Sequence, residues 1–300
     1  MTIEKIDYKG WPNSYRLSNG EVDLIATSDV GPRILHYSFK GGQNLMHVVE
    51  AMAGKSGEPT WQSRGGHRLW VGPEAVPLTY GLDNGPVVAS IENGRTIVLD
   101  QPVEPLTGVS KQIGITMSDT GSDVELVHRI YNHTLFTLEF AAWALTVMAP
   151  GGVAITGFPP RGTHPDALLP SNPLVMWPYT DFSDPRWKFT KKYLILRQDP
   201  AAVTPQKAGL FNADTWCAYL LGEDLFMKKY AASAAAVHPD MGCSFEFFTN
   251  SDMLELETMG PLTRVQPGGY LEHTERWSLR GGVNIEQWND PELDSLFGDG

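Results

Sequence analysis

The sequence predicts an all-β protein, which we interpret as a large antiparallel β-sandwich. Glycine and proline together make up 52 of the 300 residues and are spread without a period, which is typical of many short strands joined by turns. About twenty short runs have the pattern of strands, whereas windows with helical periodicity are scarce. Because strands dominate, the pattern favours an antiparallel sandwich or barrel over repeated βαβ units.

Most of the predicted strands are separated by glycine-containing turns. Residues 87–93 and 95–100 are expected to pair as a hairpin because Asn93-Gly94 favours a tight turn. Residues 135–149 are long enough for a helix, but their threonine, valine and aromatic content favours a long buried strand. The other expected strands span residues 21–27, 33–39, 67–71, 109–117, 123–131, 153–156, 187–196, 208–211, 215–221, 224–231, 244–248, 253–259 and 270–280.

Two segments are expected to lie outside the strands. Residues 157–185 are rich in proline, glycine and polar side chains, and they predict a long loop of the kind that often carries function. Residues 290–297 predict a short helix near the end of the chain. Since no shift in composition marks a boundary, we expect one domain over residues 1–300.

The composition disfavours several classes of partner. The formal net charge is −12, which argues against nucleic acid or an anionic membrane, because either would favour a basic patch. No apolar run approaches the roughly 20 residues that a membrane helix needs. The first residues contain no apolar segment of signal-peptide length, so we expect a cytoplasmic protein.

Signatures of cofactors and metals are also missing from the sequence. Cys217 and Cys243 lie in apolar, strand-like runs and are expected to be buried free thiols. The sequence has no phosphate loop, dinucleotide fingerprint, Gly-x-Ser-x-Gly elbow or His-Glu-x-x-His motif. The scattered histidines show no metal-ligand spacing, so we expect neither a cofactor nor a metal.

Residues 64–74, Arg-Gly-Gly-His-Arg-Leu-Trp-Val-Gly-Pro-Glu, form the densest group of chemically active side chains. If this segment is a strand, His67 lies on one face and Arg68 and Trp70 lie on the other. A sugar ring stacks on an aromatic plane, and its hydroxyls take charge-assisted hydrogen bonds from groups such as Arg68 and Glu74. A structural ion pair between an arginine and the glutamate explains the same residues equally well.

Two further strands place ionisable side chains together. Glu255 and Glu257 share one face of a predicted strand, roughly 7 Å apart at Cα, so their repulsion can raise one pKa towards a value useful for acid–base catalysis. A solvated outer face is the alternative. His273 and Glu275 alternate with apolar residues, which indicates either a pocket or a bulge. His128 lies between apolar neighbours, where a histidine is more often a hydrogen-bonded core residue than a catalyst.

The order of these motifs resembles the galactose mutarotase-like superfamily, which includes the aldose 1-epimerases. The resemblance covers nearly the whole chain and implies a single large antiparallel β-supersandwich that binds a sugar in the groove of its larger sheet. It rests on Gly-Gly-His-Arg-Leu-Trp-Val-Gly-Pro-Glu at 65–74, on Tyr-Asn-His-Thr at 131–134 followed by 140–152, and on Leu-Glu-Leu-Glu-Thr at 254–258 with 260–262 and 267–277.

The resemblance also implies catalytic roles. The family's epimerases open and close a sugar ring with a glutamate base and a histidine acid. The glutamate lies in a Leu-Glu-Thr context similar to that of Glu257, which makes Glu257 the candidate base and Glu255 its rival. Trp143 stands where the family's histidine would lie, so the acid would have to be His67 or His128 from another strand.

A small-molecule carbohydrate is the partner that the resemblance implies, with the sugar and the oligomeric state left open. Arg68 would hold hydroxyls and Trp70 would stack on the ring, with Glu74, Glu255 and His273 as further binding candidates. The first hypothesis is an aldose epimerase or related sugar isomerase. The second is a non-catalytic carbohydrate-binding protein, which the missing histidine favours. The third, a lyase that acts on an acidic polysaccharide, would require more basic residues than this chain offers.

Overall fold

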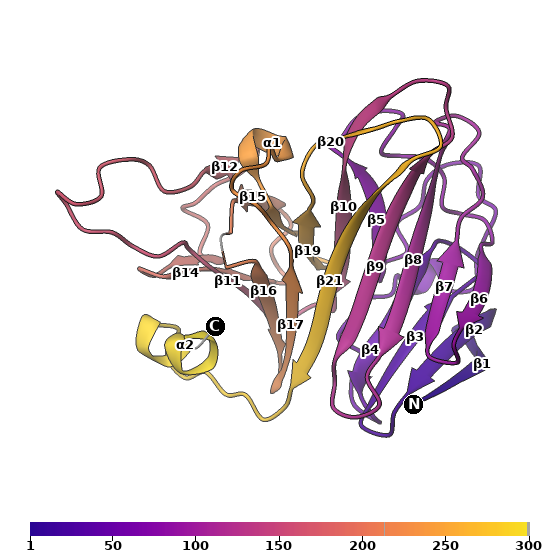
Figure 1. The fold of residues 1–300 in the computed structure, drawn as a ribbon. Coiled ribbons are helices and arrows are strands. Elements are labelled where there is room, and N and C mark those ends of the chain that lie inside the picture. The colour runs from indigo at the N-terminus through magenta and orange to yellow at the C-terminus, as the bar shows by residue number, and fades with distance from the viewer. Residues whose placement is uncertain (213, 299–300) are drawn as a thin grey trace.

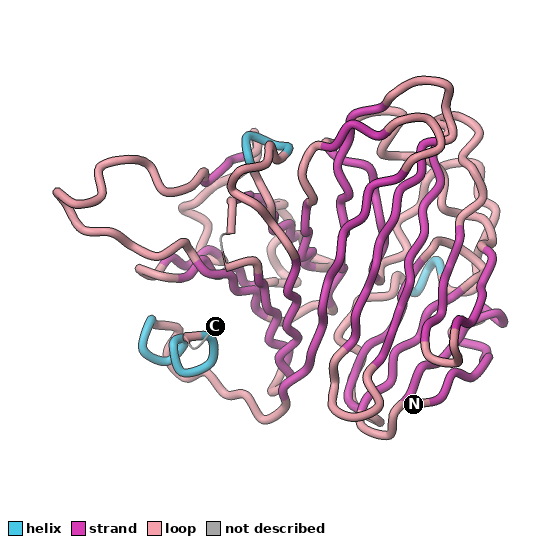
Figure 2. The backbone as a smooth tube through the Cα atoms, in the orientation of Figure 1, coloured by secondary structure: helices cyan, strands magenta, loops and turns pink. Residues whose placement is uncertain are grey.

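Two large antiparallel sheets pack face to face in the computed structural model, which describes residues 1–212 and 214–298 (Figure 1). Strands make up most of the regular structure, and the helices are short (Figure 2). The predicted all-β antiparallel sandwich is therefore confirmed.

The first sheet has 11 strands in the order β1-β2-β3-β4-β5-β10-β19-β18-β15-β12, and β20 pairs with β10 beside this path. β10 lies near the centre of this sheet, between β5 and β19, so it connects the early part of the chain to the late part. The strands are β1 (Thr2–Tyr8), β2 (Trp11–Ser18), β3 (Val22–Thr27), β4 (Arg33–Phe39), β5 (His67–Gly72), β10 (Leu138–Met148), β12 (Leu174–Met176), β15 (Gln206–Leu210), β18 (Phe245–Thr249), β19 (Leu254–Met259) and β20 (Thr263–Val265).

The second sheet has 10 strands in the order β13-β14-β11-β16-β17-β21-β9-β8-β7-β6. It includes the hairpin of β6 and β7, which the Asn93-Gly94 turn predicts. The strands are β6 (Val88–Glu92), β7 (Thr96–Asp100), β8 (Val109–Met117), β9 (Val124–Asn132), β11 (Val153–Gly157), β13 (Trp187–Phe189), β14 (Tyr193–Arg197), β16 (Trp216–Leu221), β17 (Asp224–Tyr230) and β21 (Tyr270–Arg280).

Helical structure is confined to short segments. They are the 3-10 turn η1 (Glu50–Met52), α1 (Pro239–Gly242) and α2 (Asp290–Phe297). The last of these confirms the predicted helix near the end of the chain. Among the described residues, no helix has both the length and the apolar character needed to cross a membrane.

The structure differs from the predicted elements at several places. The edge hairpin of β1 and β2 was not predicted, because β1 is largely exposed and carries no clear apolar alternation. The predicted strand 187–196 is divided into β13 and β14 by a turn. The segment 157–185 is mostly loop, but it contains the short strand β12, and residues 158–173 extend from the body of the protein (Figure 1, left).

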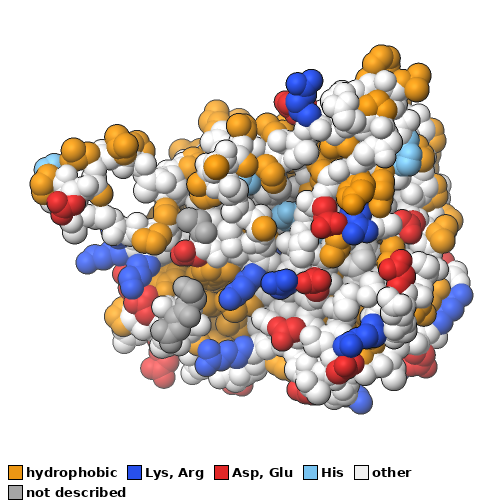
Figure 3. Space-filling view, viewed as in Figure 1, with side chains coloured by type: hydrophobic (Ala, Val, Ile, Leu, Met, Phe, Trp, Pro, Cys, Tyr) orange, Lys and Arg blue, Asp and Glu red, His pale blue; other side chains and the backbone are white. Residues whose placement is uncertain are grey.

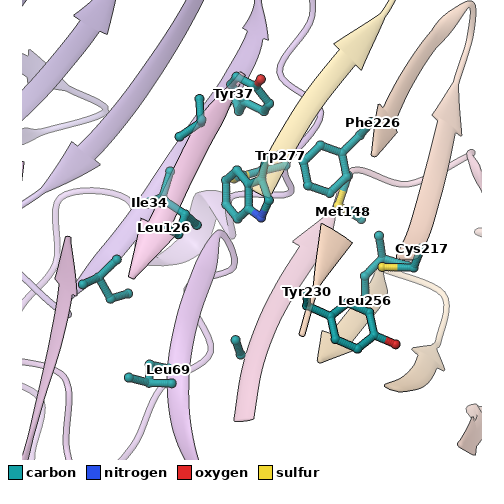
Figure 4. Close-up of a cluster of buried hydrophobic side chains, with 14 of the residues drawn as sticks. Ile34, Tyr37, Leu69, Leu126, Met148, Cys217, Phe226, Tyr230, Leu256 and Trp277 are labelled. Atoms are coloured by element: carbon teal, nitrogen blue, oxygen red, sulfur yellow. The ribbon is translucent and has the colours of Figure 1, made fainter. Parts of the chain in front are cut away.

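Apolar side chains from both sheets fill the space between them. Leu69 on β5 packs in the same buried cluster as Leu126 on β9 and Trp277 on β21 (Figure 4). Cys217 lies in this cluster too, and Cys217 and Cys243 are both buried and free, as predicted. Because alternate residues of a strand point to opposite faces, the neighbours of these inward side chains lie on the outer faces of the sheets.

The surface carries charges of both signs. On the face shown in Figure 3, acidic and basic side chains of the described residues are interspersed rather than gathered in one patch. Apolar side chains are also exposed, and they include Leu168 and Leu169 on the extended segment 158–173.

Candidate functional site

A row of side chains crosses four adjacent strands on the outer face of the first sheet. Leu145 on β10 lies directly opposite Arg68 on β5 and Glu257 on β19. Glu246 on β18 lies opposite Glu257 in turn. Directly paired residues share a face, so all four side chains project away from the sandwich core. Leu145 thus forms an apolar floor between an arginine and a pair of carboxylates.

Lys207 on β15 brings a positive charge to the two carboxylates. Its Nζ lies 2.7 Å from Glu246 Oε2 and donates a hydrogen bond of 2.8 Å to Glu257 Oε2. Trp143 Nε1 donates to the same oxygen of Glu257 at 3.0 Å. Glu257 is only 1% exposed, and within the described part of the chain no hydrogen bond involves its Oε1. One carboxylate oxygen is therefore held in place while the other stays free.

Burial changes the protonation of these groups. It raises the pKa of Glu246 well above the ordinary value, although Lys207 acts in the opposite direction. Burial also lowers the pKa of Lys207, but Glu257 and Glu246 outweigh it, so the pKa of Lys207 is raised and the amine stays charged. Glu246 thus favours the protonated form.

Arg68 forms the opposite end of the row. Its Nη2 donates to Glu255 Oε1 at 3.1 Å, and its Cζ lies 4.5 Å from the ring centroid of Trp70. Burial raises the pKa of Glu255, with Arg68 opposing the shift. The ion pair that the sequence left open therefore joins Arg68 to Glu255, not to Glu74.

Aromatic rings surround the charged groups. Trp70 packs against Trp61, Tyr80 and Trp143, with ring centroids 5.3, 5.2 and 5.4 Å away. Trp177 covers the other end, where its ring centroid lies 4.8 Å from Lys207 Nζ. We call the whole group the outer-face site. It consists of Trp61, Arg68, Trp70, Tyr80, Trp143, Leu145, Trp177, Lys207, Glu246, Glu255 and Glu257.

The side of the site nearest to solvent is formed by two loops. Glu74 is exposed and accepts a hydrogen bond from Tyr80 Oη. Tyr179 is 39% exposed, and burial together with the charges of Lys207, Glu257 and Glu74 sets its pKa, which is raised to about 12. These contacts place Glu74 and Tyr179 at the border of the site, between the buried charges and solvent.

Several buried polar atoms of the outer-face site lack a partner. Within the described part of the chain, no hydrogen bond reaches Nε and Nη1 of Arg68, the indole nitrogens of Trp61 and Trp70, or Oε1 of Glu246. A buried polar group without a partner costs about 1–3 kcal/mol. Such a concentration of unpaired atoms beside aromatic rings is expected where a polar ligand completes the hydrogen bonds.

The three predicted histidines lie between the two sheets, with His67 on the first sheet and His128 and His273 on the second. His67 pairs with Thr146, the neighbour of Leu145, and therefore points between the sheets. His128 Nδ1 donates to the carbonyl oxygen of His273 at 2.9 Å, so the bond of 2.7 Å between the two Nε2 atoms runs from His67 to His128. His273 Nε2 bonds Thr258 Oγ1 at 2.8 Å.

Glu275 and Lys228 complete this inter-sheet cluster. Their charged groups lie 3.0 Å apart and both side chains are fully buried. Ligand atoms of His67, His128 and Glu275 lie within 4.8 Å of one another, so these three residues could hold a metal ion. However, Lys228 already supplies the cation beside the carboxylate, and both histidines are fully hydrogen-bonded, which indicates a structural polar network.

The structure therefore divides the predicted site residues into two groups. Arg68, Trp70, Glu255 and Glu257 come together in the outer-face site, and Glu74 lies at its border. His67, His128 and His273 are buried between the sheets and do not meet Glu257. His67 is one position away from Arg68, so strand alternation points it through the first sheet, whereas His128 and His273 belong to β9 and β21 of the second sheet.

Sequence reasoning missed Lys207, Glu246 and Trp61. Glu246 stands alone among aromatic residues in Phe245–Thr249, and a single charge in an apolar strand was an available indication. Lys207 has a similar position in Gln206–Leu210. Neither pattern shows which strands are neighbours, so the sequence could not place these charges beside Glu257.

Solved structures of the same architecture share little sequence with this chain. A galactose mutarotase-like protein from Lactobacillus casei aligns with a TM-score of 0.59 at 9% identity, over 88% of this chain and 99% of that chain. A Klebsiella pneumoniae protein, provisionally named an aldose 1-epimerase, aligns with a TM-score of 0.59 at 11% identity, over 93% of this chain and 83% of that chain.

An Escherichia coli K12 protein with the same provisional name aligns with a TM-score of 0.54 at 12% identity, over 89% of this chain and 99% of that chain. No protein-family model matches the sequence. A search of curated proteins also finds no significant match. At these identities the structural likeness shows a shared fold and nothing finer.

Proposed function

Because this chain has the galactose mutarotase-like fold, we propose that it binds a small carbohydrate at the outer-face site. The observation that carries the proposal is the set of unpaired buried polar atoms beside aromatic rings. Sugar hydroxyls can both donate and accept, so one sugar can satisfy the donors of Arg68 and the free oxygen of Glu246. The site is nearly closed, and a ligand enters when the loops that carry Tyr80 and Tyr179 move aside.

Apolar surface supports the same proposal. A pyranose ring has an apolar face, and Leu145 offers a floor for it between Arg68 and Glu257. Trp143 and Trp70 lie opposite each other in the next row and form a wall along this floor. Stacking on these rings would orient the sugar, while the charged groups at the two ends would select its hydroxyl pattern.

Saturation-transfer NMR on a panel of monosaccharides tests the proposal. We expect wild type to bind at least one sugar and Trp177→Ala to weaken this binding by about fivefold or more, since about 1 kcal/mol of stacking is lost. Trp288→Ala is the matched control, because Trp288 is also partly buried but packs near Arg197, outside the site. A panel without any binding, or equal losses in both variants, would count against a carbohydrate site here.

Sugar ring opening is the second candidate function. Glu257 has one free oxygen that can remove the proton of the anomeric hydroxyl, and Glu246, directly opposite in register, favours the protonated form and can protonate the ring oxygen. The bond from C1 to the ring oxygen then breaks and C1 becomes a carbonyl. Reclosure on the other face exchanges the anomers. This version of an aldose epimerase needs no histidine on the outer face.

Anomer-exchange NMR on the bound sugars separates binding from catalysis. If the chain is an epimerase, wild type accelerates exchange, and Glu257→Gln lowers the rate by about 10²–10⁴-fold while the sugar still binds. Glu255→Gln, which also removes a nearby carboxylate, is the control. It should lower the exchange rate less than Glu257→Gln does. If wild type binds a sugar without accelerating anomer exchange, the carbohydrate-binding function stands and the epimerase function is wrong.

A further inference from the structure

Four unpaired N–H donors gather at one end of the outer-face site. They are Nε and Nη1 of Arg68 and the indole N–H groups of Trp61 and Trp70. The Arg68 guanidinium lies 4.5 Å from the Trp70 ring centroid and 5.8 Å from that of Trp61. The two indole rings are themselves 5.3 Å apart. The side chains that carry these four donor nitrogens are therefore packed against one another at this end of the site.

This concentration of donors differs from the other buried arginines. Among the residues that the structure describes, Arg33, Arg64 and Arg186 each have a single nitrogen without a partner, whereas Arg68 has two and also lies beside two unpaired indoles. The unpaired atoms at the far end of the site belong instead to Glu246, which can accept hydrogen bonds. The site is thus polarised, with free donors at the Arg68 end and free acceptors at the Glu246 end.

We infer that the sugar bound at the outer-face site is a hexuronate, with its carboxylate at the Arg68 end. A carboxylate has two oxygens with about four lone-pair positions, so it can accept hydrogen bonds from several of these neighbouring donors. Bonds from a guanidinium to a carboxylate are roughly twice as strong as those between neutral groups. The inference rests on the proposed carbohydrate binding and adds the chemical class of the ligand.

This orientation of the carboxylate also determines where the ring and the hydroxyls of the sugar would lie. Arg68 and Glu257 lie on strands two positions apart, or roughly 10 Å across the sheet, with Leu145 between them. This spacing is comparable to the size of one pyranose ring with its substituents. The ring hydroxyls would then face Glu257 Oε1 and Glu246 Oε1, both of which lack a bond within the described residues.

Glu255 limits the charge that the site accepts. This carboxyl group already takes Nη2 of Arg68, and Lys207 is held between two glutamates. A bound monoanion brings its charge close to Glu255, whose pKa is raised by burial, so proton uptake by Glu255 can relieve the repulsion. A phosphate carries nearly twice the charge and fits this balance poorly, which makes the carboxylate the favoured anion.

Isothermal titration calorimetry with glucuronate, galacturonate and mannuronate, beside the matching hexoses and hexose 6-phosphates, tests the inference. We expect one uronate to bind at least about tenfold more tightly than its parent hexose, since about 1.4 kcal/mol is expected from the charge-assisted bonds. Its affinity should rise as pH falls, because Glu255 takes up a proton on binding.

Two variants test the donors themselves. Arg68→Met should remove the preference for the uronate over the hexose, and Trp70→Phe should reduce it by about threefold or more, because the ring stays and one N–H donor is lost. Arg197→Met and Trp288→Phe make the same chemical changes at a cation–π pair outside the site, 5.9 Å apart, and should leave the preference unchanged. Thermal unfolding followed by circular dichroism verifies that each variant is folded.

The outcomes separate this inference from the proposed function. A hexose that binds as tightly as its uronate overturns the hexuronate assignment and leaves carbohydrate binding intact. A preference for hexose 6-phosphates overturns the assignment of a carboxylate. If neither sugars nor sugar acids bind, the carbohydrate site itself is wrong. If a uronate is preferred but Arg68→Met and Trp70→Phe retain the preference, the uronate binds elsewhere and the inference fails.

Discussion

Lys207 places a buried positive charge between the carboxyl groups of Glu246 and Glu257. Glu246 and Glu257 are paired residues of adjacent strands, and Lys207 Nζ lies 2.7 and 2.8 Å from their carboxylate oxygens. The ammonium group also lies 4.8 Å from the ring centroids of Trp143 and Trp177. A buried ion pair contributes little net stability. Removing one partner, however, leaves an uncompensated buried charge, which costs far more.

The variant Lys207→Met should therefore destabilise the fold by about 3–5 kcal/mol at pH 8. Burial already raises the pKa of Glu246 above its ordinary value, and loss of the lysine, which opposes this shift, raises it further. Groups of this kind contribute stability at low pH and lose it as pH rises, so the deficit relative to wild type should shrink at pH 5.5. Urea unfolding at both pH values measures it, with the exposed Lys188→Met as control. A deficit that does not depend on pH would contradict this role.

At the scale of single residues, the sequence predicts which side chains share a face of one strand, but it does not predict which strands are neighbours. Alternation within β5 and β19 correctly put Arg68 with Trp70 and Glu255 with Glu257, because a strand's period is local information. The meeting of these pairs depends on β10 lying between the two strands. Lys207 reaches Glu257 only because β15 and β19 both pair with β18, and the sequence contains no direct record of such long-range pairing.

At the scale of elements, Trp177, which covers one end of the outer-face site, packs closely against β15. Gly209 on β15 lies opposite Glu246. A Cβ at this position would lie 2.5 Å from Cys243 Sγ, 3.1 Å from Glu246 Cγ and 3.2 Å from the Trp177 ring. The missing side chain thus lets Trp177 lie directly over the strand, next to the charged groups.

Gly209→Ala should displace Trp177 and Cys243 and destabilise the fold by about 1–3 kcal/mol, as expected for overpacking. It should also weaken binding of any ligand at the outer-face site. Gly114→Ala on β8 is the matched control, because its Cβ would have no contact closer than 3.8 Å. Cys243→Ala in the Gly209→Ala background should recover part of the loss in urea unfolding, and the absence of any rescue would show that the steric account is wrong.

The same scale explains which strands the sequence revealed. Strands with a buried face, such as β9 and β21, show clear alternation of buried and partly exposed residues and were predicted within a residue or two. The edge strand β1 has little buried surface, and so its pattern carries no such periodicity. The alternation of apolar and polar residues reflects the burial of one face of a strand, and edge strands have the least buried surface.

Across the whole molecule, the buried inter-sheet cluster links the two sheets and sets the response to acid. Burial lowers the pKa values of His67 and His128, and it lowers the pKa of His273 to about 3. In the unfolded chain these histidines titrate near pH 6.5. Between pH 6.5 and pH 3 the unfolded state therefore binds protons that the folded state does not. Stability must fall as pH falls through this window.

We expect a steep loss of unfolding free energy between pH 6.5 and pH 5, at about 1.4 kcal/mol per pH unit for each buried histidine. Glu275, whose pKa is lowered despite burial because Lys228 and the histidines favour its charge, adds to the loss below its unfolded pKa, about 4.3. Urea unfolding at half-unit pH steps measures the slope. His273→Gln should flatten the slope by about one proton, whereas the exposed His164→Gln should leave it unchanged. If the slope is unchanged in His273→Gln, the histidine is already protonated in the folded protein. The charge of Glu275 would then stabilise the protonated form.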